Sequence, residues 1–165
     1  MPRDEELRFY VDETSMGIAR SLAAVRGDVV FPGHRRLPAV PPGTKDPDWM
    51  PVIAGLRLVV ISRDRHIKSK PAELDAYRQH GLRSFWIAGD RDLGNWENLT
   101  RLVRWWEAME RIIKTRGPGP WFFALNLTTV TELGIRPPRA RRSATTTSSS
   151  PSPRTSRGPQ LTIPW

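Results

Sequence analysis

The sequence contains no cysteine among its 165 residues. Disulfide bonds and thiolate zinc sites are therefore excluded, and a reducing compartment is a natural setting. No stretch approaches the ~18 apolar residues of a membrane-spanning helix. The first residues, MPRDEELRFYVDE, carry acids where a signal peptide has a basic region followed by an apolar run. These absences predict a soluble, cytoplasmic protein that does not enter a membrane.

Acidic residues are also scarce, with 17 Asp and Glu against 26 Lys and Arg and a net charge of +9. The excess is uneven, because five arginines and no acids follow Pro137. The rest of the chain is therefore only moderately basic. A positive surplus favours an anionic partner such as nucleic acid, and here the argument has modest weight by itself.

The composition changes near Pro137, where the chain becomes rich in Pro, Ser, Thr and Arg and has few residues to bury. We expect disorder from such a segment, which can attract nucleic acid weakly through its arginines or carry no function. With 38% hydrophobic residues the remainder is long enough for one domain with a core. The sequence thus predicts a folded domain over residues 1–136 and a disordered tail over 137–165.

Apolar runs and helical spacings alternate along residues 1–136. Near-continuous apolar runs such as LRLVVIS are typical of strands buried on both faces, and apolar residues three or four apart indicate helices. The predicted strands are 7–11, 28–31, 56–62, 83–89 and 120–127, and the predicted helices are 15–27, 46–55, 70–81 and 95–115, with a Pro-rich loop over 32–45. This β-α alternation predicts an α/β fold with a mostly parallel sheet between two layers of helices.

Three aspartates fall at or near one edge of that sheet. Asp12 ends the first strand, Asp64 follows the central strand, and Asp46 opens the helix before it, where we expect it at the N-cap. Ligands of open parallel sheets collect at the carboxyl ends of strands, and converging carboxylates need a cation between them. Taken singly, each aspartate is equally explained as a turn or cap residue. Their spacing leaves both interpretations open.

Three segments of the sequence resemble a known family. RFYVDE, then DPDWMP, then VVISRDRHIKSKPAEL are similar to the PIN-like nuclease domain, in particular to the toxin-type branch related to the VapC ribonucleases of toxin–antitoxin pairs. The similarity extends over about residues 7–130. It implies a three-layer α/β/α domain that cleaves RNA phosphodiester bonds with Mg²⁺ or Mn²⁺.

The resemblance assigns the catalytic and metal-binding positions to Asp12, Asp46 and Asp64. Asp48 is the second choice for the middle position. Asp92, or Asp90, is a candidate for a fourth acid, although a surface turn is the favoured explanation of either. Bound ions of this kind lower the pKa of a coordinated water and clamp the scissile phosphate, so no side-chain nucleophile is needed.

The basic residues around Asp64 fit a polyanionic substrate. We expect Arg63, Arg65, Lys68 and Lys70 to contact RNA phosphates, with Arg35 and Arg36 lining the same groove. The alternative is a solvated charged face. Of the tryptophans, Trp49 neighbours the site and is the candidate for base stacking, and nearly all the others are expected in the core.

Two other classes of function compete with a ribonuclease toxin. A catalytically inactive PIN-like module, or a receiver-like signalling module, would act by binding RNA or a protein partner. A toxin would need an antitoxin partner, for which the helix carrying Trp105 and Trp106 could offer a surface. The sequence leaves self-association into a homo-oligomer open.

Overall fold

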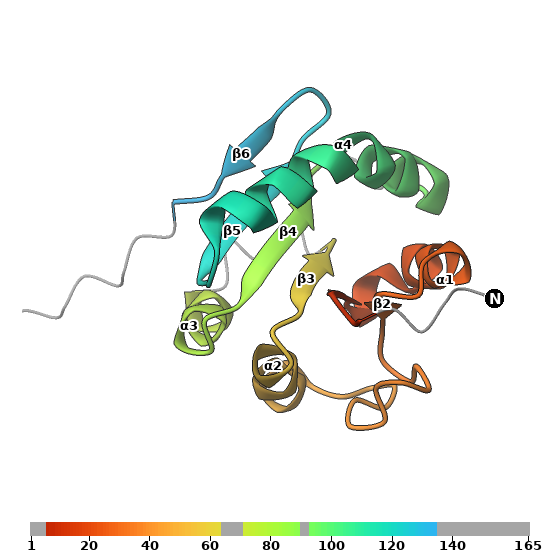
Figure 1. Ribbon diagram of the computed structural model, residues 1–165, viewed down its shortest axis with the longest axis vertical. Helices are drawn as coiled ribbons and strands as arrows, with labels where there is room; N and C mark the ends of the chain where they lie inside the picture. The colour runs from red at the N-terminus through yellow and green to blue at the C-terminus, as the bar shows by residue number, and fades with distance from the viewer. Residues whose placement is uncertain (1–5, 64–70, 90–92, 135–165) are drawn as a thin grey trace, which may run out of the picture.

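The computed structural model describes residues 6–63, 71–89 and 93–134. Its centre is a six-stranded sheet in the order β2-β1-β3-β4-β5-β6 (Figure 1). All neighbouring strands are parallel except β5 and β6. The strands are β1 Phe9–Val11, β2 Val29–Val30, β3 Val59–Ser62, β4 Arg83–Ile87, β5 Trp121–Leu125 and β6 Val130–Glu132.

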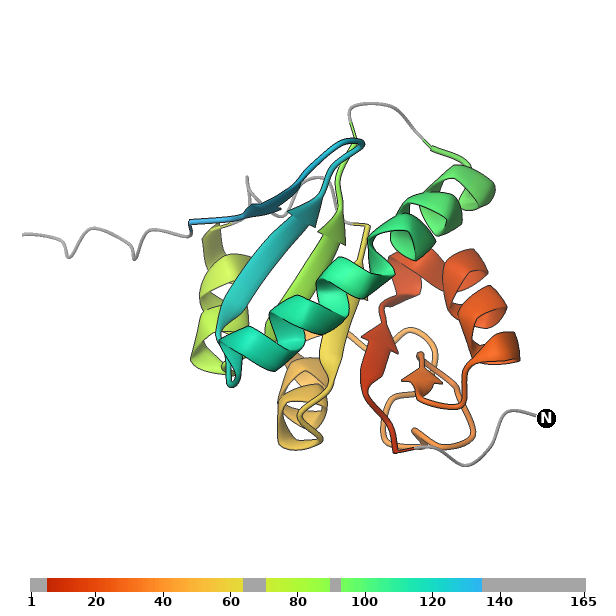
Figure 2. The ribbon, with the colours of Figure 1, turned by 45° about the horizontal axis from the view of Figure 1, so that its top comes forward.

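Helices cover both faces of this sheet. α1 and α4 lie on one face and α2 and α3 on the other, as Figures 1 and 2 show from two directions. The helices are α1 Met16–Val25, α2 Asp46–Gly55, α3 Pro71–Gln79 and α4 Asn95–Arg116, and a short 3₁₀ turn spans Glu13–Ser15. The predicted three-layer α/β/α architecture is confirmed. None of the helices in the described ranges is long and apolar enough to cross a membrane.

The final strand, β6, was not predicted, because residues 120–127 were expected to form the last strand. β6 has only three residues, two of them exposed, and pairs antiparallel with the edge of β5. A turn closes this hairpin through a 2.9 Å hydrogen bond from the Asn126 N–H to the Thr129 carbonyl. Such a short, half-exposed strand has no alternating pattern long enough to detect. The predicted tail, 137–165, lies outside the described residues.

Side chains of β1 alternate between two apolar layers. Phe9 and Val11 pack in the layer under α1 and α4, whereas Tyr10 packs in the layer under α2 and α3. All three are fully buried, as expected for a strand between two parallel neighbours. Because side chains alternate along an extended chain, Asp12 follows Tyr10 toward the α2 and α3 side.

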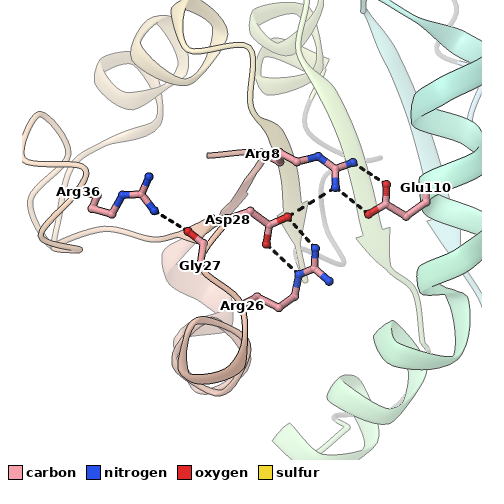
Figure 3. A network of polar contacts seen from close by, with 6 residues as sticks. All are labelled: Arg8, Arg26, Gly27, Asp28, Arg36 and Glu110. Carbon is pink, nitrogen blue, oxygen red and sulfur yellow. Dashed lines mark hydrogen bonds and ion pairs between the residues drawn. The ribbon is translucent and has the colours of Figure 1, made fainter. Parts of the chain in front are cut away.

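A buried charge lies at the opposite, amino-terminal end of β1 and β2 (Figure 3). The Asp28 carboxylate accepts hydrogen bonds at 2.9 and 2.7 Å from Arg26 and forms a 3.6 Å ion pair with Arg8. Arg8 also donates to Glu110 of α4 at 3.0 and 2.5 Å. Two cations thus compensate the buried carboxylate, which would otherwise be strongly unfavourable in the core.

Helices α2 and α3 end in the same kind of turn. In α2 the Leu58 N–H donates to the Ile53 carbonyl and the Arg57 N–H to the Ala54 carbonyl, which is the Schellman arrangement. α3 repeats it at Leu82 and Gly81. Gly81 has φ +64°, and Arg57 has φ 55°. A side chain in this left-handed conformation costs about 1 kcal/mol, which is why glycine usually occupies it.

We predict that Arg57→Gly raises the free energy of unfolding by about 0.5–1 kcal/mol, because glycine adopts the left-handed conformation without strain. Urea unfolding at neutral pH measures the change. Arg111→Gly, in the exposed interior of α4, should instead lower it by about 1 kcal/mol. A loss of stability in Arg57→Gly would show that the arginine side chain makes a favourable contact that outweighs the strain.

Candidate functional site

The strand order changes direction between β1 and β3, because β1 is followed in the chain by β2 on one side, and β3 by β4 on the other. Ligands of parallel α/β sheets bind in the crevice at the carboxyl ends of such a strand pair. The ends are held in register by a 3.1 Å hydrogen bond from the Asp12 N–H to the Ile61 carbonyl. Asp12 therefore lies where the fold favours a ligand.

Asp12 is a buried carboxylate, with 8% of its surface exposed. The Thr14 hydroxyl donates to Asp12 Oδ1 at 2.6 Å and fixes its orientation. A carboxylate has about four acceptor positions, so one bond from a hydroxyl is compatible with coordination of a cation by the same group. A partly desolvated anion of this kind favours a nearby cation.

Asp46 lies in the first turn of α2, and its side chain is held by a neighbour within the helix. Trp49 Nε1–H donates to Asp46 Oδ1 at 2.9 Å. The expectation that Asp46 is the N-cap is wrong, because Lys45 occupies that position and the helix begins at Asp46. The expectation of base stacking by Trp49 is also wrong. Trp49 is 4% exposed and packs on Tyr10, with ring centroids 5.0 Å apart.

Asp12 and Asp46 lie near the same two buried tyrosines, because Trp49, which donates to Asp46, packs on both Tyr10 and Tyr77. Burial raises the pKa of Tyr10, and the charges of Asp12, Asp46 and Glu13 raise it further. Burial likewise raises the pKa of Tyr77 of α3, with Asp12 and Asp46 as the next causes. Both phenols therefore stay neutral beneath the carboxylates. The structure thus brings together two of the three predicted site aspartates.

Glu73 also belongs to this corner, and sequence reasoning assigned it no role. It lies in the first turn of α3, is half-buried, and contributes to the raised pKa of Tyr77. The signal was present in the PAEL segment, since a carboxylate one turn into a helix after the central strand shares its edge of the sheet. From the sequence alone, Glu73 was indistinguishable from an acidic residue that only stabilises the first turn of its helix.

The remaining predicted site residues have different outcomes. Asp64 and Asp92, and the basic residues Arg65, Lys68 and Lys70, lie outside the described residues. Across residues 6–63, 71–89 and 93–134, no group of three or more His, Asp or Glu side chains is arranged to hold a metal ion. The donor chemistry of Asp12 and Asp46 nevertheless suits a hard divalent cation, which prefers carboxylate oxygens.

Of the three predicted RNA-binding arginines that the structure describes, Arg63 and Arg36 make intramolecular contacts. Arg63, directly after β3, donates to the Leu93 carbonyl at 3.3 Å and connects the ends of β3 and the segment before α4. Arg36 donates to the Gly27 carbonyl at 2.6 Å, at the amino-terminal end of β2 (Figure 3). The expectation that Arg36 lines the carboxylate groove is therefore wrong.

Glu13 connects the Pro-rich loop to the end of β1. Its carboxylate accepts from the Gly43 N–H, at 3.0 Å for Oε1 and 3.3 Å for Oε2. Leu37 and Val40 of the same loop are buried in the α2 and α3 layer. The loop predicted over 32–45 is confirmed, and these contacts position its end, from which α2 and Asp46 begin.

Tryptophans of α4 differ in exposure. Trp96 is 77% exposed, contrary to the expectation that it packs in the core. Trp105 and Trp106 face their own domain: the Trp105 indole donates to the Asn126 carbonyl at 2.8 Å, and Trp106 packs on Phe9 with ring centroids 4.9 Å apart. Both indoles are therefore half-buried against their own domain, and the suggestion that this helix offers a surface for an antitoxin stays a prediction.

Stability should fall above pH 10 through Tyr10 and Tyr77, the only two tyrosines of the chain. Their folded-state pKa lies above the ordinary 10.0, so the unfolded chain releases these protons first. The stability they contribute is complete below pH 10 and is lost as pH rises, by up to about 1.4 kcal/mol per pH unit for each tyrosine.

Urea unfolding from pH 8 to 11, with tyrosinate absorbance of the native protein, measures this effect. Tyr10→Phe should flatten the decline without lowering stability at pH 8, because the buried Tyr10 hydroxyl has no hydrogen-bond partner among the residues that the structure describes. Native tyrosinate appearing near pH 10 would contradict the burial of both phenols.

Comparison with known proteins supports this description of the fold. The sequence matches the family described as PIN like domain over residues 7–89, which is about half of the chain and includes Asp12, Asp46 and Glu73. No curated protein and no solved structure matches the chain. The matched segment contains β1 through β4. Domains of this family are typically nucleases. The chain belongs to the PIN-like domain family, a fold of the nuclease type.

Proposed function

We propose that this protein is a divalent-metal-dependent endoribonuclease whose active site is the carboxyl edge of β1 and β3. The observation that carries the proposal is the common corner of Asp12 and Asp46: Trp49, which donates to Asp46, packs on Tyr10, and Asp12 follows Tyr10 on the same side of the strand. Membership of a family of typical nucleases supports the reaction type. Asp64, two residues beyond the end of β3 in the sequence, completes the proposed set.

The carboxylates of Asp12, Asp46 and Asp64 would hold Mg²⁺ or Mn²⁺, which prefer carboxylate oxygens. When bound, such an ion supplies a water of lowered pKa and a clamp on the scissile phosphate. The chain's own contribution is orientation. Thr14 fixes the Asp12 carboxylate and Trp49 fixes that of Asp46, so neither needs to reorganise.

Basic residues after β3 would bind the RNA backbone. Arg63, Arg65, Lys68 and Lys70 follow one another closely beside Asp64 and offset the repulsion between the carboxylates and phosphates. The RNA would therefore lie across the carboxyl ends of the strands. We further propose that the protein is the toxin of a toxin–antitoxin pair, in which case a co-expressed antitoxin protein abolishes cleavage.

The decisive experiment compares two aspartates of one helix. Asp46 and Asp48 both lie in the first turn of α2, and both are exposed. We predict that Asp46→Asn and Asp12→Asn lower Mn²⁺-dependent cleavage of a single-stranded RNA panel by about 100-fold or more. Asp48→Asn should retain activity. The fold is preserved because the new asparagine at position 46 still accepts from Trp49 through its Oδ1, and the one at position 12 still accepts from Thr14.

Calorimetric titration with Mn²⁺ separates metal binding from chemistry. We expect weaker binding in Asp12→Asn and Asp46→Asn but not in Asp48→Asn. Cleavage that survives chelation, or that depends on Asp48 and not Asp46, would overturn the proposed metal set. Absence of both cleavage and metal binding would favour the alternative of an inactive module that only binds RNA or a protein partner.

A further inference from the structure

A pocket of about 520 Å³ lies at the amino-terminal ends of β3 and β4. This end is opposite to the edge that carries Asp12. The volume falls within the range of small-ligand sites. The residues that line the pocket come from the two turns preceding β3 and β4 and from the segment before β5: Ala54, Arg57, Leu58, Gly81, Leu82, Arg83, Pro118 and Gly119.

The two matched helix ends form the walls of the pocket. Leu58 and Leu82, one after each left-handed residue, are buried. The backbone turns are alike, with φ 55° at Arg57 and +64° at Gly81. In the turn after α3 the left-handed position is occupied by glycine, Gly81. The equivalent turn after α2 would therefore form without a side chain at position 57. An unfavourable backbone conformation retained by a charged residue is a sign of function.

Arg57 and Arg83 carry the charge of the pocket. Arg83 donates from Nη2 to the Arg57 carbonyl. Within the part of the chain that the structure describes, neither guanidinium has a carboxylate partner, whereas nearby Arg8 pairs with both Asp28 and Glu110. The pKa of Arg83 is lowered by burial and then by the charges of Arg57 and Arg8. Positive charge is therefore in excess here.

The carboxyl ends of α2 and α3 offset part of that excess. Each helix end carries about half a negative charge, so together they balance about one of the two arginines. The remaining surplus favours an anion. Guanidinium groups suit phosphate because their N–H donors match two oxygens at once.

We propose that this pocket binds a small phosphate monoester, with Arg57 and Arg83 on the phosphate and Leu58, Leu82 and Pro118 against its organic part. The inference is independent of the nuclease proposal, because the pocket shares no residue with the carboxylate corner. Many phosphate esters combine a phosphate group with an apolar organic part. Phenyl phosphate, a simple aryl ester, has both parts and is therefore a sufficient probe.

Calorimetric titration of the full chain with phenyl phosphate, inorganic phosphate and phenol tests both parts of the pocket. We expect phenyl phosphate to bind about tenfold or more tightly than inorganic phosphate, and phenol not to bind measurably. Equal affinity for phenyl phosphate and inorganic phosphate would overturn the role of the apolar wall. Absence of phenyl phosphate binding would overturn the site.

Arg57→Gly and Arg83→Gln should each weaken phenyl phosphate binding about tenfold or more, while Arg111→Gln on the exposed surface of α4 should leave it unchanged. Arg57→Gly is the sharper variant, because its expected gain in stability separates loss of binding from loss of fold. Phenyl phosphate should raise the melting temperature of the original chain and not that of Arg57→Gly.

Undiminished binding in both pocket variants would overturn the assignment. Asp12→Asn distinguishes this inference from the nuclease proposal, since it should keep phenyl phosphate binding even if RNA cleavage is lost. Loss of phenyl phosphate binding in Asp12→Asn would place the ligand at the carboxylate corner and contradict the pocket.

Discussion

The parallel pairing of β1 with β3 is the constraint on which the site depends. Phe9, Tyr10 and Val11 lie opposite Val59, Val60 and Ile61, and the strands on either side diverge from this pair in chain order. The connections consequently leave on opposite faces, with α1 on one side and α3 on the other. In open parallel α/β sheets, such a divergence leaves an opening at the carboxyl ends of the two strands. The Asp12 carboxylate reaches that opening because its own N–H is fixed to β3.

Charge is divided between the two ends of the sheet. The carboxyl end holds Asp12, Asp46 and Glu73, whereas the amino end holds Arg57 and Arg83 beside the paired Arg8. Asp28, although acidic, lies at the amino end and is neutralised by two arginines. The net charge of +9 therefore says little about either site. What each end can bind follows from the charges that gather there, rather than from the total.

Patterns that repeat over many residues were predictable, and single contacts were not. The apolar stripe of residues 95–115 and the run before Ser62 determine elements by burial alone, so all four helices and the five parallel strands were anticipated. β6 is too short for such a pattern. The contacts of the Trp49 indole and the Glu73 carboxylate depend on which residues α2 and α3 pack against in the folded protein. Local sequence spacing carries no information about those tertiary neighbours. Asp12 was found because a strand end is itself a local feature.

Helix α2 connects the two ends of the sheet. Its first turn carries Asp46 and the turn after it carries Arg57, so each terminus bears a charge that complements the helix dipole. Ten helical residues span about 15 Å, which is too far for one small ligand to touch both charges. Met50 and Ile53 are fully buried between them and hold the helix against the sheet. Any movement of α2 that coupled a ligand at Arg57 to Asp46 would have to disturb the core layer that Met50 and Ile53 share with Tyr10.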